Sequence, residues 1–223
     1  MRLPEPLQES LSNLFFPYNV TCPLCTRSLV GAEQTVCCNC EKKLEQCLLT
    51  PAEQLSAHEP LKLCISAFSY EDPAKELIHI LKYRSDTTVA PLLGLYLAKT
   101  LLDVLHRPCW DVIIPVPMQP GRQADRGYNQ AELLAKAVAH HWQSPIRNDL
   151  LFRIREDGSQ TKRTAAERRE AITRVFVASP LAYGKHILLV DDVLTTGATA
   201  SACAKALLEA GAAEVILLTL CQA

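Results

Sequence analysis

The sequence carries no excess of charge of either sign. Its 23 lysines and arginines nearly balance 24 acidic residues, which leaves a formal net charge of −1. Such a chain has no overall field that would gather nucleic acid or an anionic membrane, so any basic site must be local. Aromatic residues are also few, with six tyrosines, five phenylalanines and two tryptophans, and they offer no plain stacking platform for single-stranded nucleic acid.

Long apolar runs and targeting signals are missing as well. No apolar run reaches the length needed to cross a bilayer, and the N-terminus lacks the charged start, apolar stretch and small-residue cleavage site of a secretory signal. We therefore expect a cytoplasmic protein without membrane insertion. The chain does contain ten cysteines, but in a reducing compartment these are not expected to form a disulfide framework.

Four of the cysteines have the spacing of a metal site. Cys22 and Cys25 form one CxxC pair, and Cys37 and Cys40 form a second pair after eleven intervening residues. Four thiolates at this spacing suit a tetrahedral zinc ion. An iron–sulfur cluster is the competing cofactor, because ligand softness and geometry do not separate the two in a sequence. Cys38 is an alternative ligand, although closure of a CxxC pair favours Cys37.

The chain divides into two regions of different character. Residues 1–50 are dense in cysteine and predict a small metal-binding module, whereas residues 51–223 alternate apolar strands with helical periodicity. This alternation predicts an α/β fold with an open parallel sheet and right-handed crossovers. Strands are expected at 61–70, 111–117, 150–154, 175–177, 186–190 and 214–220. Helices are expected at 73–85, 92–105, 129–142 and 197–211.

The turn after the apolar segment 186–190 is the most informative feature. It begins with Asp191 and Asp192 and continues through small and hydroxyl residues into a helix. Small residues let the backbone wrap around an anion, Gly197 permits a positive φ, and the start of the helix offers free N–H groups. The two acids can accept hydrogen bonds from vicinal ribose hydroxyls, so the turn suits a sugar phosphate. The alternative is an acidic turn in which a threonine merely caps the helix.

The segment VDDVLTTGAT resembles the loop that binds phosphoribosyl pyrophosphate (PRPP) in type I phosphoribosyltransferases. Other motifs resemble one branch of that family, the ComF/GntX-like competence proteins: CPLC and CNC, FSYEDPAKELIHILKYRSD, DVIIPVPMQPGRQADRGYNQ and SQTKRTAAERREAITRVF. Ser85 and Ala171 depart from the Gly and Asn that are common in the family. The resemblance implies a type I phosphoribosyltransferase-like open parallel sheet over residues 51–223, joined to a zinc-ribbon-like module over residues 1–50.

The same resemblance implies roles for individual residues. Magnesium-bound PRPP would place its pyrophosphate at the turn after 111–117, beside Arg126. On the residues alone, Arg122 and Arg126 suit a solvated basic loop equally well, and Lys82 suits the C-terminal end of a helix dipole. The implied catalytic residues are Asp191, Asp192, and, from a lid over 155–174, Arg163 and Arg168. The implied PRPP-binding residues are Lys82, Pro115, Val116, Pro117, Met118, Arg126, Asp191, Asp192, Val193, Leu194, Thr195, Thr196, Gly197, Ala198 and Thr199.

The function that the resemblance implies is a competence-associated phosphoribosyltransferase acting in natural transformation, in the processing of incoming single-stranded DNA. No motif identifies the acceptor of the phosphoribosyl group. The alternative is a non-catalytic module that uses the PRPP fold to engage single-stranded DNA, or competence or recombination partner proteins.

Overall fold

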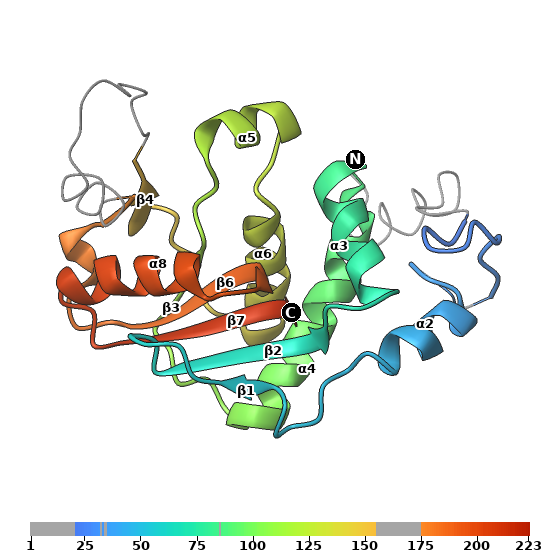
Figure 1. The fold of residues 1–223 in the computed structure, drawn as a ribbon, viewed down its shortest axis with the longest axis horizontal. Coiled ribbons are helices and arrows are strands. Elements are labelled where there is room, and N and C mark those ends of the chain that lie inside the picture. Colours follow the sequence, from blue (N-terminus) through green and yellow to red (C-terminus); the bar gives the residue numbers. More distant parts are fainter. Residues whose placement is uncertain (1–20, 32, 34, 85, 155–174) are drawn as a thin grey trace, which may run out of the picture.

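A parallel sheet forms the centre of the molecule. The computed structural model describes residues 21–31, 33, 35–84, 86–154 and 175–223. The sheet has the strand order β1-β2-β7-β6-β3, in which only β1 runs antiparallel to its neighbour (Figure 1). The five strands are β1 Leu55–Ser56, β2 Leu63–Ser69, β3 Val112–Pro115, β6 His186–Leu194 and β7 Glu214–Gln222. The predicted α/β fold with an open parallel sheet is confirmed.

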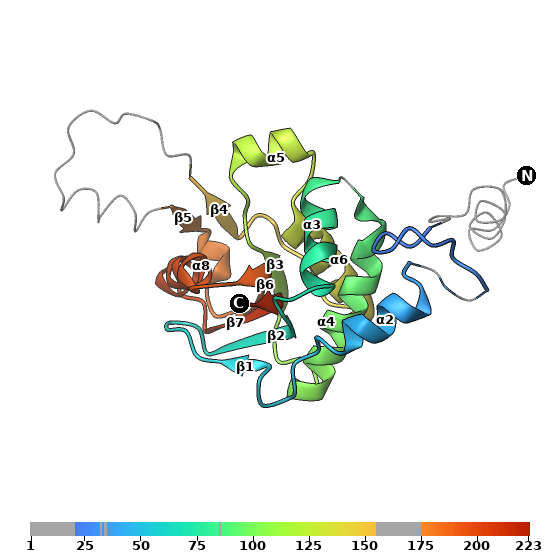
Figure 2. The same ribbon diagram turned by 45° about the vertical axis from the view of Figure 1, so that its right-hand side comes forward.

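Helices cover both faces of this sheet. Side chains alternate between the faces of a strand, and on β6 Ile187 and Leu189 pack with α8, whereas Leu188 and Val190 pack with α3, α4 and α6. Figure 2 shows α8 on one side of the sheet and α4 and α6 on the other. The helices are α2 Cys38–Glu45, α3 Ala74–Tyr83, α4 Ala90–Leu105, α5 Pro120–Arg126, α6 Gln130–Trp142 and α8 Ala198–Glu209, with 3-10 turns at Thr87–Val89 and Pro180–Ala182.

Local signals in the sequence explain several element boundaries. Asn129 caps α6, because its Oδ1 accepts a hydrogen bond of 3.0 Å from the backbone N–H of Ala131. Gly211 follows α8 with a φ of 90°, as expected of a glycine that ends a helix. The predicted strands 150–154 and 175–177 also form, as β4 Leu151–Arg153 and β5 Phe176–Ala178. These two pair antiparallel with each other outside the main sheet.

Two helices have no counterpart in the sequence prediction. Helix α2 lies within the cysteine-rich region, and α5 lies in the turn after β3, where its seven residues project away from the sheet (Figure 1). Neither helix is long enough for apolar periodicity to stand out, and α5 has no buried residue.

One segment corrects the expectation that no apolar run is long enough to span a membrane. Thr87–Leu105 is long enough and apolar enough to cross a membrane. Half of its most apolar window is buried within the molecule, and Leu93, Leu97 and Leu101 of α4 are fully buried in the core. Such a pattern is typical of a core helix, so the segment is weak support for a membrane span.

The contact between α4 and α6 depends on a glycine. A Cβ placed on Gly94 would lie 2.1 Å from the Cβ of Ala137 on α6, which is far inside van der Waals contact. Glycine costs about 1 kcal/mol relative to alanine within a helix, so close helix packing is the physical reason for a glycine here.

We therefore expect Gly94→Ala to lower the free energy of unfolding by about 2 kcal/mol, because overpacking outweighs the gain in helix propensity. Gly121→Ala on α5 is the matched control, since no atom lies within 4 Å of a Cβ at that position. Chemical denaturation of both variants measures the difference. Equal stabilities would show that the helices can separate without cost.

Candidate functional site

Two adjacent acids lie near the carboxyl end of β6. The strand extends to Leu194, so Asp191 and Asp192 belong to its last residues and do not follow it. Asp192 is buried, with 6% of its surface exposed, whereas Asp191 is partly buried. The backbone N–H of Asp192 donates a hydrogen bond of 2.8 Å to Oδ1 of Asp191. The carboxyl end of a parallel strand is where ligands bind in sheets of this kind.

The charge of Asp192 is compensated by two neighbouring helices. Lys82 Nζ, at the end of α3, lies 2.9 Å from Asp192 Oδ2. Gln130 Nε2, at the start of α6, donates a hydrogen bond of 2.9 Å to the same oxygen. A buried carboxylate without such partners would cost several kcal/mol. The pair of donors therefore fixes the position of Asp192 within the sheet edge.

Asp191 has fewer partners and a different electrostatic environment. Burial raises its pKa to about 7, and the nearby charge of Asp192 adds to this shift. The hydrogen bond from the backbone N–H of Asp192 and the positive charge of Lys82 act in the opposite direction. Perturbed carboxyl groups of this kind concentrate at functional sites.

The loop after β6 faces solvent. Thr195, Thr196 and Thr199 are exposed, and Gly197 has a φ of 74° in the left-handed region. Gly197 supplies no side-chain cap to α8, and the hydrogen bond from the N–H of Ala198 to Thr196 Oγ1 is long, at 3.5 Å. The first-turn amides of α8 are therefore disposed to receive an anion.

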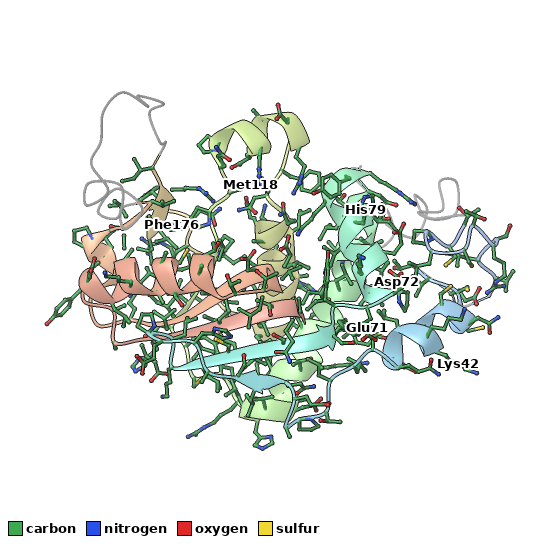
Figure 3. The ribbon with its side chains drawn as sticks, viewed as in Figure 1. Lys42, Glu71, Asp72, His79, Met118 and Phe176 are labelled. Carbon is green, nitrogen blue, oxygen red and sulfur yellow. The ribbon has the colours of Figure 1, made fainter. Side chains whose placement is uncertain are left out.

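The turn after β3 lies beside this loop because β3 is the sheet neighbour of β6. Pro115 and Pro117 have no backbone N–H, and the N–H of Val116 is already bonded to Val190 O at 2.9 Å. Val116 O accepts a further hydrogen bond of 3.0 Å from Asn129 Nδ2. Of the four residues predicted to contact pyrophosphate, Met118 thus keeps a backbone donor for a ligand; it lies at the base of the α5 projection (Figure 3).

Arg126 is connected to the acids, whereas Arg122 is exposed. Arg126 Nη1 donates a hydrogen bond of 2.7 Å to Gln130 Oε1, and its guanidinium lies 5.1 Å from the centre of the Tyr83 ring. Because Gln130 also bonds Asp192, the structure brings Arg126, Lys82 and the acids into one cluster. Arg163 and Arg168 lie outside the described residues.

Sequence reasoning missed three residues of this region. Gln130 ends the segment DVIIPVPMQPGRQADRGYNQ, but no role was predicted for it. Tyr83 stacks with Arg126. His58 precedes β2, and its ring fills the space where a Cβ on Gly197 would lie, 2.5 Å from Nδ1. No local pattern links His58 to a loop more than a hundred residues away.

The four predicted cysteine ligands converge in space. The Sγ atoms of Cys22, Cys25, Cys37 and Cys40 all lie within 4.8 Å of one another. Zinc–sulfur bonds of about 2.3 Å in a tetrahedron place sulfurs about 3.8 Å apart, and Cys25 Sγ and Cys37 Sγ are separated by 3.6 Å. The group could therefore bind one metal ion, and Cys38 is not part of it.

Glu33 holds the loop between the two cysteine pairs. Its carboxylate accepts hydrogen bonds from the backbone N–H groups of Cys38, at 2.8 Å, and Val30, at 2.9 Å, and pairs with Arg27. The backbone donors lower the pKa of Glu33 to about 2. Hydrogen bonding from the backbone N–H of Cys40 lowers the pKa of the Cys37 thiol to about 6, whereas burial raises the pKa of the Cys40 thiol. Metal binding requires deprotonated thiols, so it would release protons at this cluster.

Comparison with known proteins gives a family match for part of the chain. Residues 127–223 match the phosphoribosyl transferase domain family. The chain is 23% identical to glutamine PRPP amidotransferase from Bacillus subtilis, solved with ADP and GMP, with a TM-score of 0.44; the match covers 59% of this chain and 26% of that chain. The chain thus spans about a quarter of the length of that enzyme.

Relatives that match most of the chain carry names linked to DNA. The DNA utilization protein YhgH of Escherichia coli O157:H7 is 30% identical over 90% of this chain and 89% of its own length. Competence protein ComFC of Bacillus subtilis (strain 168) is 30% identical over 87% of this chain and 74% of its own length. Competence protein F of Haemophilus influenzae is 32% identical over 70% of this chain and 66% of its own. The chain therefore belongs to the ComF/GntX-like competence protein family, with a phosphoribosyltransferase-like domain and a cysteine cluster that precedes it.

Proposed function

We propose that this chain binds Mg-PRPP at the carboxyl edge of its sheet and acts as a competence-associated phosphoribosyltransferase. The observation that supports the proposal is that Asp191 and Asp192 lie beside the loop 195–199 with its three exposed threonines, and beside two cations: Lys82, which pairs with Asp192, and Arg126, which is linked to Asp192 through Gln130. A bare phosphate site would need the loop but not the acids. A sugar that carries phosphate groups at both ends needs the loop, the acids and the cations.

Each part of the site would act on a different part of the ligand. The amides and threonine hydroxyls of Thr195–Thr199 would bind the 5-phosphate, and Asp191 would accept hydrogen bonds from ribose hydroxyls. Arg126, Lys82 and the N–H of Met118 would face the pyrophosphate, and magnesium bound with PRPP would offset further negative charge. A nucleophile would form a bond to C1 while the C1–O bond breaks and its electron pair leaves with pyrophosphate.

We also propose zinc as the metal of the cysteine cluster, in a structural role. Four thiolates without an open position are typical of structural zinc sites. The module, residues 1–50, would support the domain of residues 51–223, since Cys22, Val36 and Leu44 share one apolar cluster with Leu77 and Leu97. Metal binding would then contribute to the stability of that shared core.

The names of the relatives support a proposal for the biological role. Relatives called competence and DNA utilization proteins suggest a role in natural transformation, in processing incoming single-stranded DNA in the cytoplasm. Release of pyrophosphate from PRPP by the purified protein would distinguish an enzyme from a module that only binds.

Calorimetry with Mg-PRPP tests the site directly. We expect saturable binding with one site per chain, and a loss of at least about tenfold in affinity for Asp191→Asn, because an uncharged amide accepts ribose hydroxyl bonds less strongly. Asp103→Asn makes the same chemical change at an exposed position of α4 and should bind like the wild type. Absence of binding to the wild-type protein would disprove the proposal.

The raised pKa of Asp191 predicts opposite effects of pH on affinity and stability. Affinity for Mg-PRPP should rise as pH increases through about 7, because Asp191 ionises there, and should lose this step in Asp191→Asn. Stability shows the reverse trend. A carboxyl group whose folded pKa exceeds its unfolded value of 3.8 contributes stability below pH 4 that is lost as pH rises towards 7.

Asp191→Asn should therefore be more stable than the wild type at pH 8, by an amount on the order of 2 kcal/mol, and should show no gain at pH 4. Urea unfolding at the two pH values measures this difference. A wild-type protein whose advantage over the variant grows with pH would contradict the assigned environment of Asp191.

The metal site predicts a contrast between neighbouring cysteines. Purified protein should contain about one zinc ion per chain, and Cys40→Ser should lose it together with part of the thermal stability. Cys38→Ser, two residues away and outside the cluster, should keep both. Elemental analysis distinguishes zinc from iron. Iron together with acid-labile sulfide would contradict the zinc proposal and identify an iron–sulfur cluster.

A further inference from the structure

Gln130 connects Asp192 with Arg126 in the proposed PRPP site. Its Nε2 donates a hydrogen bond of 2.9 Å to Asp192 Oδ2, and its Oε1 accepts one of 2.7 Å from Arg126 Nη1. A carboxylate cannot donate and a guanidinium cannot accept, so the orientation of the amide is fixed by its partners. Asparagine is too short by one methylene to span both partners from the same backbone position.

The two bonds connect groups that would contact different parts of the ligand. Asp192 is buried at the sheet edge beside the acid proposed to bind ribose, and Arg126 ends the α5 projection next to the turn proposed to bind pyrophosphate. Arg126 also stacks against Tyr83 of α3, and Tyr128 donates its hydroxyl hydrogen bond to Leu81 O on the same helix. The α5 projection is thus held against α3, with Gln130 as the link to β6.

The hydrogen bonds also indicate different roles for the two acids. Asp192 Oδ2 already receives donors from Lys82 and Gln130, whereas Asp191 receives one backbone N–H. Asp191 therefore has the larger free acceptor capacity for ribose hydroxyls, and Asp192 acts as the fixed anchor for the surrounding cations.

We infer that Gln130 is a positioning residue: it holds Asp192, which lies next to the acid proposed to bind ribose, at a fixed position relative to Arg126, which is proposed to face the pyrophosphate. It thereby sets the preference of the site for a ligand that carries both a ribose and a pyrophosphate. This inference rests on the proposed function. A ligand with ribose and 5-phosphate but no pyrophosphate, such as ribose 5-phosphate, would not engage Arg126. Loss of Gln130 should therefore weaken binding of PRPP more than binding of ribose 5-phosphate.

The test compares two ligands across three variants. Gln130→Met keeps the length and approximate volume of the side chain but removes both hydrogen bonds. Gln130→Glu keeps an acceptor for Arg126 but places a second carboxylate against Asp192. Gln123→Met makes the same change as the first variant at an exposed residue of α5 and serves as the matched control. Calorimetry at pH 8 with Mg-PRPP and with magnesium plus ribose 5-phosphate gives two dissociation constants for each protein.

We expect Gln130→Met to weaken Mg-PRPP binding about tenfold and ribose 5-phosphate binding less than threefold, so that the ratio of the two constants changes. Gln130→Glu should weaken Mg-PRPP binding at least as much, because like charges oppose each other at the Asp192 end. Gln123→Met should leave both constants unchanged. Thermal unfolding near the wild-type temperature would show that the variants are folded.

Two failures have different meanings. If the wild-type protein binds Mg-PRPP and the ratio is unchanged in Gln130→Met, or Gln130→Glu binds like the wild type, the role of Gln130 is wrong while the proposed function stands. Equal weakening of both ligands also leaves the ratio unchanged, and it would show that Gln130 only supports the fold. If the wild-type protein does not bind Mg-PRPP, the proposed function and this inference both fail.

Discussion

The buried charge of Asp192 is the constraint on which the site depends. A carboxylate with 6% of its surface exposed is stable only with partners, and these come from two helices that are separated in sequence, α3 and α6. Compensation of this charge therefore requires the C-terminal end of α3 and the N-terminal end of α6 to meet at the carboxyl end of β6. The groups proposed to bind the ligand are placed by the same requirement.

The parallel sheet supplies the rest of the arrangement. Because β3 pairs with β6, the turns that follow these strands emerge side by side, and the α5 projection starts from one of them. The backbone of that turn is largely committed to the protein, since Val116 bonds both Val190 and Asn129. Side chains such as Arg126 therefore have to supply much of the positive charge that a pyrophosphate would need, which increases the importance of how Arg126 is held.

The sequence predicted the parts of this structure whose signals are local. Apolar periodicity predicted α3, α4, α6, α8 and the sheet strands β2, β3, β6 and β7, but not β1. The CxxC spacing predicted the four cysteines, and acids followed by threonines indicated the turn after β6. It did not predict α5, which has no buried residue, or the contacts of Gln130 and His58. These contacts join residues far apart in the chain, as Gln130 and Asp192 are separated by 62 positions, and no local pattern in the sequence indicates them.

The acids of β6 and the loop after them are proposed to bind a phosphorylated ribose. A crystal structure of the protein grown with magnesium and a stable PRPP analogue tests this most directly. We expect the 5-phosphate to lie among the backbone amides of residues 195–199, with a ribose hydroxyl hydrogen-bonded to Asp191. An analogue bound elsewhere on the molecule, with Asp191 and the loop free of it, would contradict the claim.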